Sequence, residues 1–116
     1  MKALPPEMLK QVSTIFKAMG EPNRLLILQA LCREPMCVKE IVEVTAMRQA
    51  NVSKHLSMLR TSRLVGVERN NGKSIYSLSD PRIPKICDIV CSSVSDRIKE
   101  SALVARSMKR RQRRSS

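Results

Sequence analysis

The fold is decided by the stretch Gln49-Ala50-Asn51-Val52-Ser53-Lys54-His55-Leu56-Ser57-Met58-Leu59-Arg60-Thr61. Its apolar residues Val52, Leu56 and Leu59 recur at the spacing of one face of an α-helix, so we expect this face to point into a core. The opposite face carries small and amide-bearing residues, and no glutamate occurs between Glu43 and Glu68. A helix face that meets only solvent would carry more acidic residues, so the pattern favours contact with a polyanion.

A short helix and a turn precede this stretch. Val38, Ile41, Val42 and Val44 predict a helix after the break at Glu34-Pro35, and Thr45-Ala46-Met47 predicts a tight turn. A short helix, a turn and a longer helix make a helix-turn-helix, whose second helix enters the major groove of DNA. We therefore expect a recognition helix from about Gln49 to Thr61.

A β-hairpin is predicted directly after this helix. Apolar runs at residues 64–69 and 74–78 flank Asn70-Asn71-Gly72-Lys73, and Asn-Gly between two such runs favours a type I′ turn. An isolated two-stranded hairpin is marginally stable in water, so this one should lie against the helices. Arg69 and Lys73 would then project from its tip. A basic hairpin in this position is a wing.

Three further helices are expected around this unit. Helical spacing of apolar residues predicts one from Pro6 to Gly20, a buried one after Glu21-Pro22-Asn23, and a last one from Pro84. The predicted fold class is therefore mainly α with a small β-hairpin wing, a winged helix-turn-helix in the order of four helices, two strands and a last helix. We expect one domain over residues 1–108. Residues 109–116 have no apolar side chain to pack and are expected to form a basic flexible tail.

The last predicted helix carries an apolar stripe that includes two cysteines. The residues on this stripe are Cys87, Val90, Cys91, Val94 and Ile98. The stripe is longer than so small a domain can cover, so we expect a partner subunit to pack on it.

The positive charge is concentrated in two segments. The 116-residue chain has a formal net charge of +12, with six basic residues and one acid from Arg48 to Lys73, and six basic residues and no acid from Arg106 to Arg114. Clustered Lys and Arg gain affinity for phosphate backbones by releasing condensed counterions. Solubility alone is the competing explanation, but charge inside a helix-turn-helix favours double-stranded DNA. The residues predicted to contact it are Arg48, Gln49, Asn51, Ser53, Lys54, His55, Arg69 and Lys73.

Other classes of protein fit the sequence less well. The chain reaches Pro5 and Pro6 without an apolar signal segment, and no apolar run approaches the roughly 20 residues of a membrane span, so we expect a cytoplasmic protein without a membrane partner. His55 is the only histidine, and no paired nucleophile and base, phosphate-binding glycine loop or CxxC motif occurs. We expect no enzymatic activity and no obligatory cofactor.

The four cysteines, Cys32, Cys37, Cys87 and Cys91, should be reduced in the cytoplasm. Cys87 and Cys91 are four residues apart, so their sulfurs lie on one helix face, close enough to share a soft ion. One hypothesis is that they bind a thiophilic metal or metalloid ion or react with oxidised sulfur, aided by Cys37 or by a thiol of the partner subunit. The alternative is that they are small apolar fillers of the stripe. Cys32 is expected to lie in the core.

From Leu9 to Ile98 the chain resembles the ArsR, or arsenic-repressor, family of winged-helix regulators. The resemblance rests on Gly20-Glu21-Pro22-Asn23-Arg24-Leu25-Leu26-Ile27-Leu28, on the segment from Gln49 to Arg60, and on Leu64-Val65. It implies a homodimer held by the first and last helices, with recognition helices in successive major grooves of a palindromic operator, about 34 Å apart. It also implies release from DNA by a thiophilic metal ion, a metalloid or an oxidising sulfur species.

The sensing sites typical of the family are incomplete in this chain. Met36-Cys37-Val38-Lys39 keeps one cysteine of the family's Cys-Val-Cys pair, the last helix has no histidine, and Gln29 stands where sulfide-responsive members have a cysteine. The Cys87 and Cys91 pair is the candidate that remains. The sequence thus predicts a homodimeric repressor released from its operator by a small thiol-reactive inducer.

Two alternative functions remain open at this point. The first is a constitutive or architectural DNA-binding protein with structural cysteines and no inducer. The second is an RNA-binding winged helix, but the chain has one Tyr, one Phe and no Trp to stack on unpaired bases.

Overall fold

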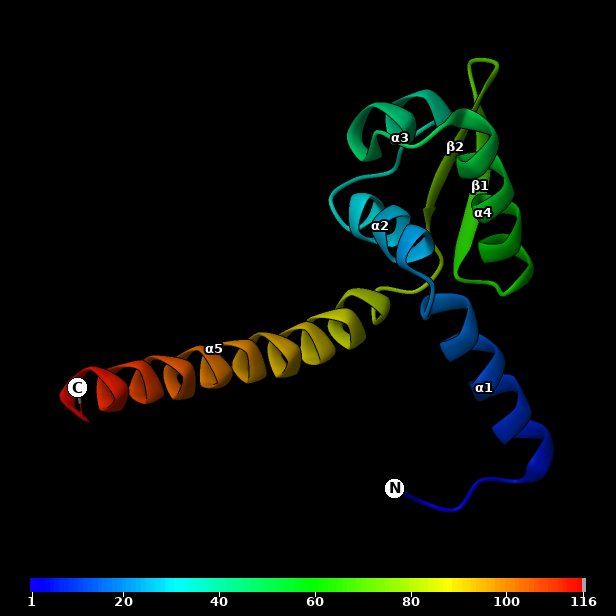
Figure 1. The fold of residues 1–116 in the computed structure, drawn as a ribbon. Coiled ribbons are helices and arrows are strands. Elements are labelled where there is room, and N and C mark those ends of the chain that lie inside the picture. The colour runs from blue at the N-terminus through cyan, green and yellow to red at the C-terminus, as the bar shows by residue number, and fades with distance from the viewer. Residues whose placement is uncertain (116) are drawn as a thin grey trace. The chain divides into compact units, whose positions relative to one another are not determined.

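The structure is a computed structural model that describes residues 1–115 (Figure 1). In chain order its elements are α1 (Pro6–Met19), α2 (Pro22–Leu31), α3 (Val38–Thr45), α4 (Gln49–Thr61), β1 (Val65–Asn70), β2 (Lys73–Leu78) and α5 (Ile83–Ser115). The predicted winged helix-turn-helix is confirmed, including the bounds of the recognition helix. The chain divides into two compact units, Met1–Ile83 and the remainder from Pro84 onward. Each unit is described by itself below.

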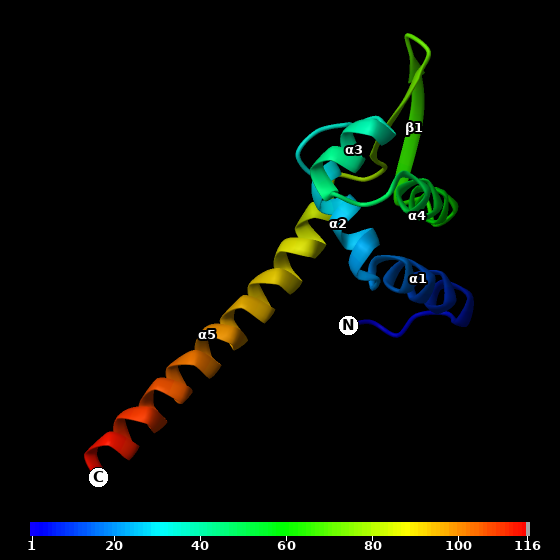
Figure 2. The same ribbon diagram turned by 45° about the horizontal axis from the view of Figure 1, so that its top comes forward.

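The core of the first unit is aliphatic. Its α2 helix packs against α3 and α4, and α4 packs against β1, as Figures 1 and 2 show. This arrangement gives α2 apolar neighbours on several sides, which fits the leucines and isoleucine spread around it. The largest fully buried side chains belong to Ile27, Leu28, Ile41, Val52, Leu56 and Leu59.

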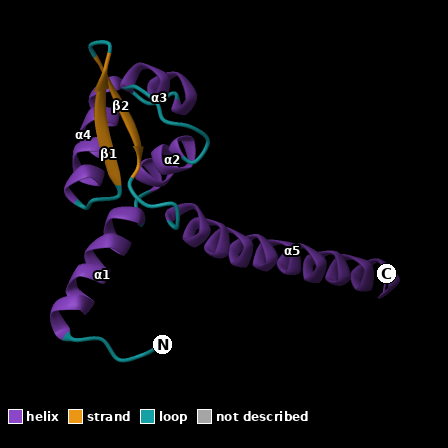
Figure 3. Ribbon diagram, turned by 180° about the vertical axis from the view of Figure 1, so that it is seen from behind, coloured by secondary structure: helices purple, strands orange, loops and turns teal. Residues whose placement is uncertain are grey.

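The wing is an antiparallel hairpin with a tight turn (Figure 3). Its register runs from Val65 opposite Leu78 to Asn70 opposite Lys73. Asn71 and Gly72 have φ values of 52° and 77°, so both central residues take the left-handed conformation expected for a type I′ turn.

A short bridge ties the wing to the loop between α2 and α3. The N–H of Met36 donates to the Tyr76 carbonyl at 3.0 Å, and the N–H of Tyr76 donates to the Met36 carbonyl at 2.8 Å. The buried Met36 side chain therefore enters the core beside a strand that would otherwise pair on one edge only.

The turn between α3 and α4 depends on one strained residue. Ala46 ends α3 with φ 58° and ψ 18°, and its N–H donates to the Val42 carbonyl at 2.9 Å. The Thr45 hydroxyl donates to the Ile41 carbonyl at 2.6 Å and accepts from the Met47 N–H at 3.3 Å. These bonds fix the direction in which the chain enters α4, while the Cβ of Ala46 opposes the left-handed conformation.

Replacing Ala46 by glycine should therefore stabilise the protein. We expect the free energy of unfolding to rise by about 1 kcal/mol, since glycine adopts a positive φ without steric cost and this outweighs its larger loss of entropy. Urea denaturation followed by helical circular dichroism measures the change. Ala50→Gly, within α4, is the matched control and should destabilise. Equal destabilisation by both variants would contradict the strain assigned to Ala46.

The second unit is a single long helix. The domain boundary after residue 108 stays a prediction, and by its contacts the chain divides between Ile83 and Pro84. Residues 109–115, expected to be a flexible tail, continue α5 to Ser115, and residue 116 lies outside the described residues. No glycine or proline follows Pro84, and Lys, Arg, Gln and Met all favour helix. Neither α5 nor any other described helix is apolar enough over a sufficient length to cross a membrane.

Candidate nucleic-acid interface

The outward face of α4 is the centre of the candidate interface. Val52, Leu56 and Leu59 are at most 1% exposed, which confirms the predicted inward face. The predicted DNA contacts Arg48, Gln49, Asn51, Ser53 and Lys54 are all exposed. Because α4 has no acidic residue, this face carries only positive and neutral groups.

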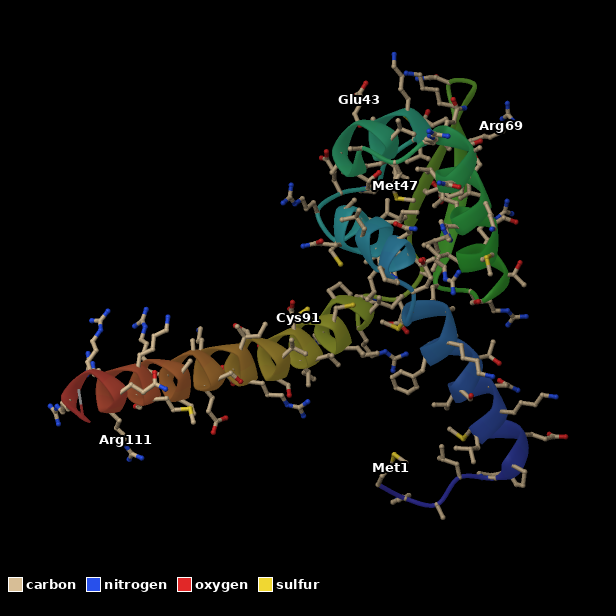
Figure 4. All side chains as sticks on the ribbon, in the orientation of Figure 1. Met1, Glu43, Met47, Arg69, Cys91 and Arg111 are labelled. Atoms are coloured by element: carbon tan, nitrogen blue, oxygen red, sulfur yellow. The ribbon has the colours of Figure 1, made fainter. Side chains whose placement is uncertain are left out.

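The wing adds positive charge beside this helix. Its strand β1 packs against α4 within the same unit, and Arg69 and Lys73 are exposed near the turn. Figure 4 shows the Arg69 side chain extending outward from the hairpin. The structure thus brings the two predicted wing residues and the α4 face together on one compact unit.

The arrangement can make two kinds of contact with a duplex. The side-chain amides of Gln49 and Asn51 each offer a donor and an acceptor, the combination that pairs with the edge of adenine in the major groove. Lys54, Arg69 and Lys73 offer cationic donors for phosphate oxygens, which fix position without reading sequence.

His55 was expected to contact DNA, and the structure corrects this. Its exposure is 8%, and Nδ1 lies 3.8 Å from Oε2 of Glu21. Nδ1 is buried and makes no hydrogen bond within the described residues. The signal was available in the sequence, because His55 lies three residues after Val52 and four before Leu59, which places it on the inward face of α4.

The start of α2 forms a junction that sequence reasoning did not identify. Oε2 of Glu21 accepts a hydrogen bond from the Arg24 N–H at 2.9 Å, and this bond lowers the pKa of the Glu21 carboxyl below its ordinary value. Nε and Nη2 of Arg24 donate to the carbonyls of Ala18 and Lys17 at 2.7 and 3.3 Å, which caps the end of α1.

Arg24 also reaches the recognition helix. Its Nη1 donates to Sδ of Met58 on α4 at 3.4 Å. The side chains of Glu21 and Arg24 therefore connect the ends of α1 and α2 to two positions of α4. These contacts give Glu21 and Arg24 a structural role within the segment from Gly20 to Leu28, on which the family resemblance rests.

Two of the four cysteines lie in the first unit. All four are thiols in the described chain. Cys32, expected in the core, is exposed; it follows Leu31, the last residue of α2, as the C-cap of that helix. Cys37 is half-buried where α3 begins, and its N–H donates to Oε1 of Glu40 at 3.2 Å. The pKa of Glu40 is lowered by hydrogen bonds from the Cys37 side chain and backbone, so Cys37 takes part in the capping of α3.

The other two cysteines lie on α5. Cys87 is half-buried and Cys91, labelled in Figure 4, is exposed. They are one helical turn apart, so the pair presents two thiols on one face. Among the described residues, no three His, Cys, Asp or Glu side chains gather into a group that could hold a metal ion.

Both α1 and α5 leave large apolar side chains open in the single subunit. Phe16 on α1 is 59% exposed, and Ile98 on α5 is 65% exposed. Contiguous exposed apolar faces of this kind mark interaction surfaces. The other members of these two faces are Met8, Leu9, Val90, Val94, Val104 and Met108.

Comparison with known proteins places the fold and the interface in context. The solution structure of a homodimeric winged helix-turn-helix DNA-binding domain from Mycobacterium bovis superimposes with a TM-score of 0.75, covering 86% of this chain and 95% of that one. At 22% sequence identity this likeness shows the fold alone.

Sequence relatives extend the comparison beyond the fold. Nodulation protein NolR of Rhizobium meliloti is 33% identical over 113 residues, covering 92% of this chain and 93% of that protein. The transcriptional repressor SmtB homolog of a Synechocystis strain is 30% identical over 92 residues, covering 79% and 67%. The family described as "Bacterial regulatory protein, arsR family" matches residues 21–67, from the junction before α2 into β1. The chain therefore belongs to the ArsR family of DNA-binding transcriptional regulators, which are not enzymes.

Proposed function

We propose that this regulator is a homodimeric repressor that leaves its operator when a thiol-reactive inducer acts on its cysteines. The observation that carries the DNA-binding part is the exposed face of α4, free of acidic residues and packed beside a basic wing. Gln49 and Asn51 would read base edges, and Ser53 would serve either a base or a phosphate. Arg48, Lys54, Arg69 and Lys73 would bind phosphates.

The dimer is proposed on the apolar faces of α1 and α5. Each is unpartnered in the single subunit, and burying a side chain such as Phe16 or Ile98 would contribute roughly 1.5–3 kcal/mol. The similar domain from Mycobacterium bovis is homodimeric. A two-fold axis would present two recognition helices to half-sites about 34 Å apart. The repressor role is supported by the SmtB homolog, which is named a transcriptional repressor.

The inducer is proposed to act at Cys87 and Cys91. A soft metal or metalloid ion would bind the two sulfurs as thiolates with release of their protons, and thiols of the partner subunit would complete its coordination. A persulfide donor would instead take up two electrons and two protons from two cysteine thiols. A disulfide would form between the cysteines while the sulfur–sulfur bond of the donor breaks, and the donor would leave as a thiol and hydrogen sulfide. Either reaction at the open face of α5 would alter the packing of the dimer that holds both recognition helices. Cys37 is a weaker candidate because it already caps α3.

Serine at both positions should strongly weaken the response to inducer. Reduced wild-type protein bound to operator DNA is titrated with arsenite, cadmium and a persulfide donor, and at least one should release it. Cys87→Ser combined with Cys91→Ser should raise the required concentration by about 100-fold, since thiolate ligands account for the affinity for soft ions. Fluorescence anisotropy of the operator measures release.

Single Cys32→Ser and Cys37→Ser variants serve as controls and should respond like wild type. Release of the double variant at the wild-type concentration would refute the role of the α5 pair. Operator binding by the wild type that no inducer reverses would instead support a constitutive repressor.

A further inference from the structure

The C-terminal turns of α5 separate charge from apolar residues. Successive steps of 100° along the helix gather a basic set on one side and continue the apolar stripe on a neighbouring side. No acidic residue follows Glu100. The basic set, all of it exposed, is Arg106, Lys109, Arg110, Arg113 and Arg114. The neighbouring apolar stripe contains Val94, Ile98, Ala105 and Met108, and Arg111 falls on the remaining side of the helix.

We propose that this basic face of α5 binds the phosphate backbone of double-stranded DNA flanking the operator, as a contact additional to α4 and the wing. The inference rests on the proposed function, because the same subunit must hold the operator. It assigns a role to residues that neither the helix-turn-helix nor the cysteine pair uses.

Helical order is what makes this segment a binding surface. In a flexible tail each charge would have to be immobilised separately, at a cost in side-chain and backbone entropy. On α5 the residues from Arg106 to Arg114 span about 12 Å at 1.5 Å per residue. Duplex DNA carries about one negative charge per 1.7 Å of its axis, so a face of this length meets several phosphates at once.

Charge and composition favour duplex DNA over other polyanions. The segment from Ser101 to Ser115 has no aromatic residue that could stack on single-stranded bases. An anionic membrane would bind a basic helix best when its apolar side inserts among the lipids. Here that side continues the stripe that we assign to the second copy of the chain.

Two variants with equal loss of charge test the proposal. The first combines Arg106→Gln, Arg110→Gln and Arg113→Gln, which keeps a strong helix former at each position. The matched control combines Lys85→Gln, Arg97→Gln and Lys99→Gln, upstream on the same helix. Circular dichroism verifies the helix content of both. The affinity of each variant is measured for two duplexes across a range of salt concentrations. One duplex is limited to the operator, and the other extends it by about two helical turns on each side.

We expect the C-terminal variant to bind the extended duplex about 10-fold or more weakly than wild type, with a salt slope reduced by about 2–3, near 0.9 for each lost phosphate contact. On the short duplex it should match wild type. The control variant should resemble wild type on both duplexes. A C-terminal variant that behaves like the control on both duplexes would overturn the proposal. So would a C-terminal variant that binds both duplexes like wild type and loses only binding to single-stranded RNA or to phosphatidylserine vesicles.

Failure of the proposed function would look different. In that case the wild type would not prefer an operator to an unrelated duplex, and Lys54→Glu would leave binding to the short duplex unchanged. The contact made by α5 would still appear as a salt-dependent difference between the C-terminal variant and its control on the extended duplex.

Discussion

Reversing one charge on α4, by Lys54→Glu, should weaken operator binding by roughly 100-fold. The variant loses a phosphate contact and places a carboxylate against the phosphate backbone, and effects of about 1–3 kcal/mol are typical of residues at such an interface. Lys54 is exposed on the outward face of a helix without acidic residues, so no neighbouring carboxylate on α4 offsets its charge. Operator titrations at several salt concentrations measure both the affinity and the salt slope, which should fall by about 1 or more.

Lys99→Glu on α5 is the control for this prediction. It changes the net charge of the protein equally, but it lies outside the proposed readers and about two helical turns before the basic set of α5, which begins at Arg106. It should alter operator affinity only a few-fold, through the general field of the molecule. Asn51→Ala should behave differently from both, with lower discrimination between operator and unrelated sequence. Equal losses from Lys54→Glu and Lys99→Glu would remove α4 from the interface.

The features that the sequence predicted correctly are those that depend on the local spacing of residues. The inward face of α4 follows from the spacing of Val52, Leu56 and Leu59, and the wing follows from Asn71-Gly72 between two apolar runs. Both signals depend on residues a few positions apart, where helix and hairpin geometry leave little freedom.

The predicted DNA contact of His55 was wrong because it followed the polarity of the side chain and not its position on the helix. Its spacing places it on the inward side of α4, but its ring suggested a contact with phosphate. A buried imidazole next to Glu21 needs a partner from a segment 34 residues away in the chain, and no local pattern reveals that pairing. The contacts of Arg24 with α1 and α4, and the bridge between Met36 and Tyr76, are hidden for the same reason.

The predicted flexible tail differs from the observed end of α5 for another reason. The sequence predicts a flexible tail after Met108 because no apolar residues follow, and a segment without them cannot build a core. A helix that continues an existing one needs no core of its own, since each added residue extends the hydrogen-bond ladder without a new nucleus. The basic residues at the end of α5 are therefore helical because they extend the turns that precede them.

The largest expected loss of stability comes from Leu28→Ala in α2. Leu28 is fully buried where α2 meets α3 and α4, and truncation of such a leucine typically costs 2–5 kcal/mol, through lost burial and a residual cavity. Since single domains are stable by only about 5–15 kcal/mol, this loss is a large part of the total. Urea denaturation at a fixed protein concentration, which keeps the contribution of dimerisation constant, measures it.

Leu25→Ala is the matched control for this change, because it removes the same atoms from the same helix three residues earlier. Leu25 is 42% exposed, so its truncation should cost about 1 kcal/mol or less. Similar losses in both variants would mean that α2 is not the centre of the core. If the two separate as expected, operator DNA in excess should partly restore the midpoint of Leu28→Ala, because DNA binds only the folded protein. Stability lost in α2 and affinity carried by α4 would then be linked through the core that the two helices share.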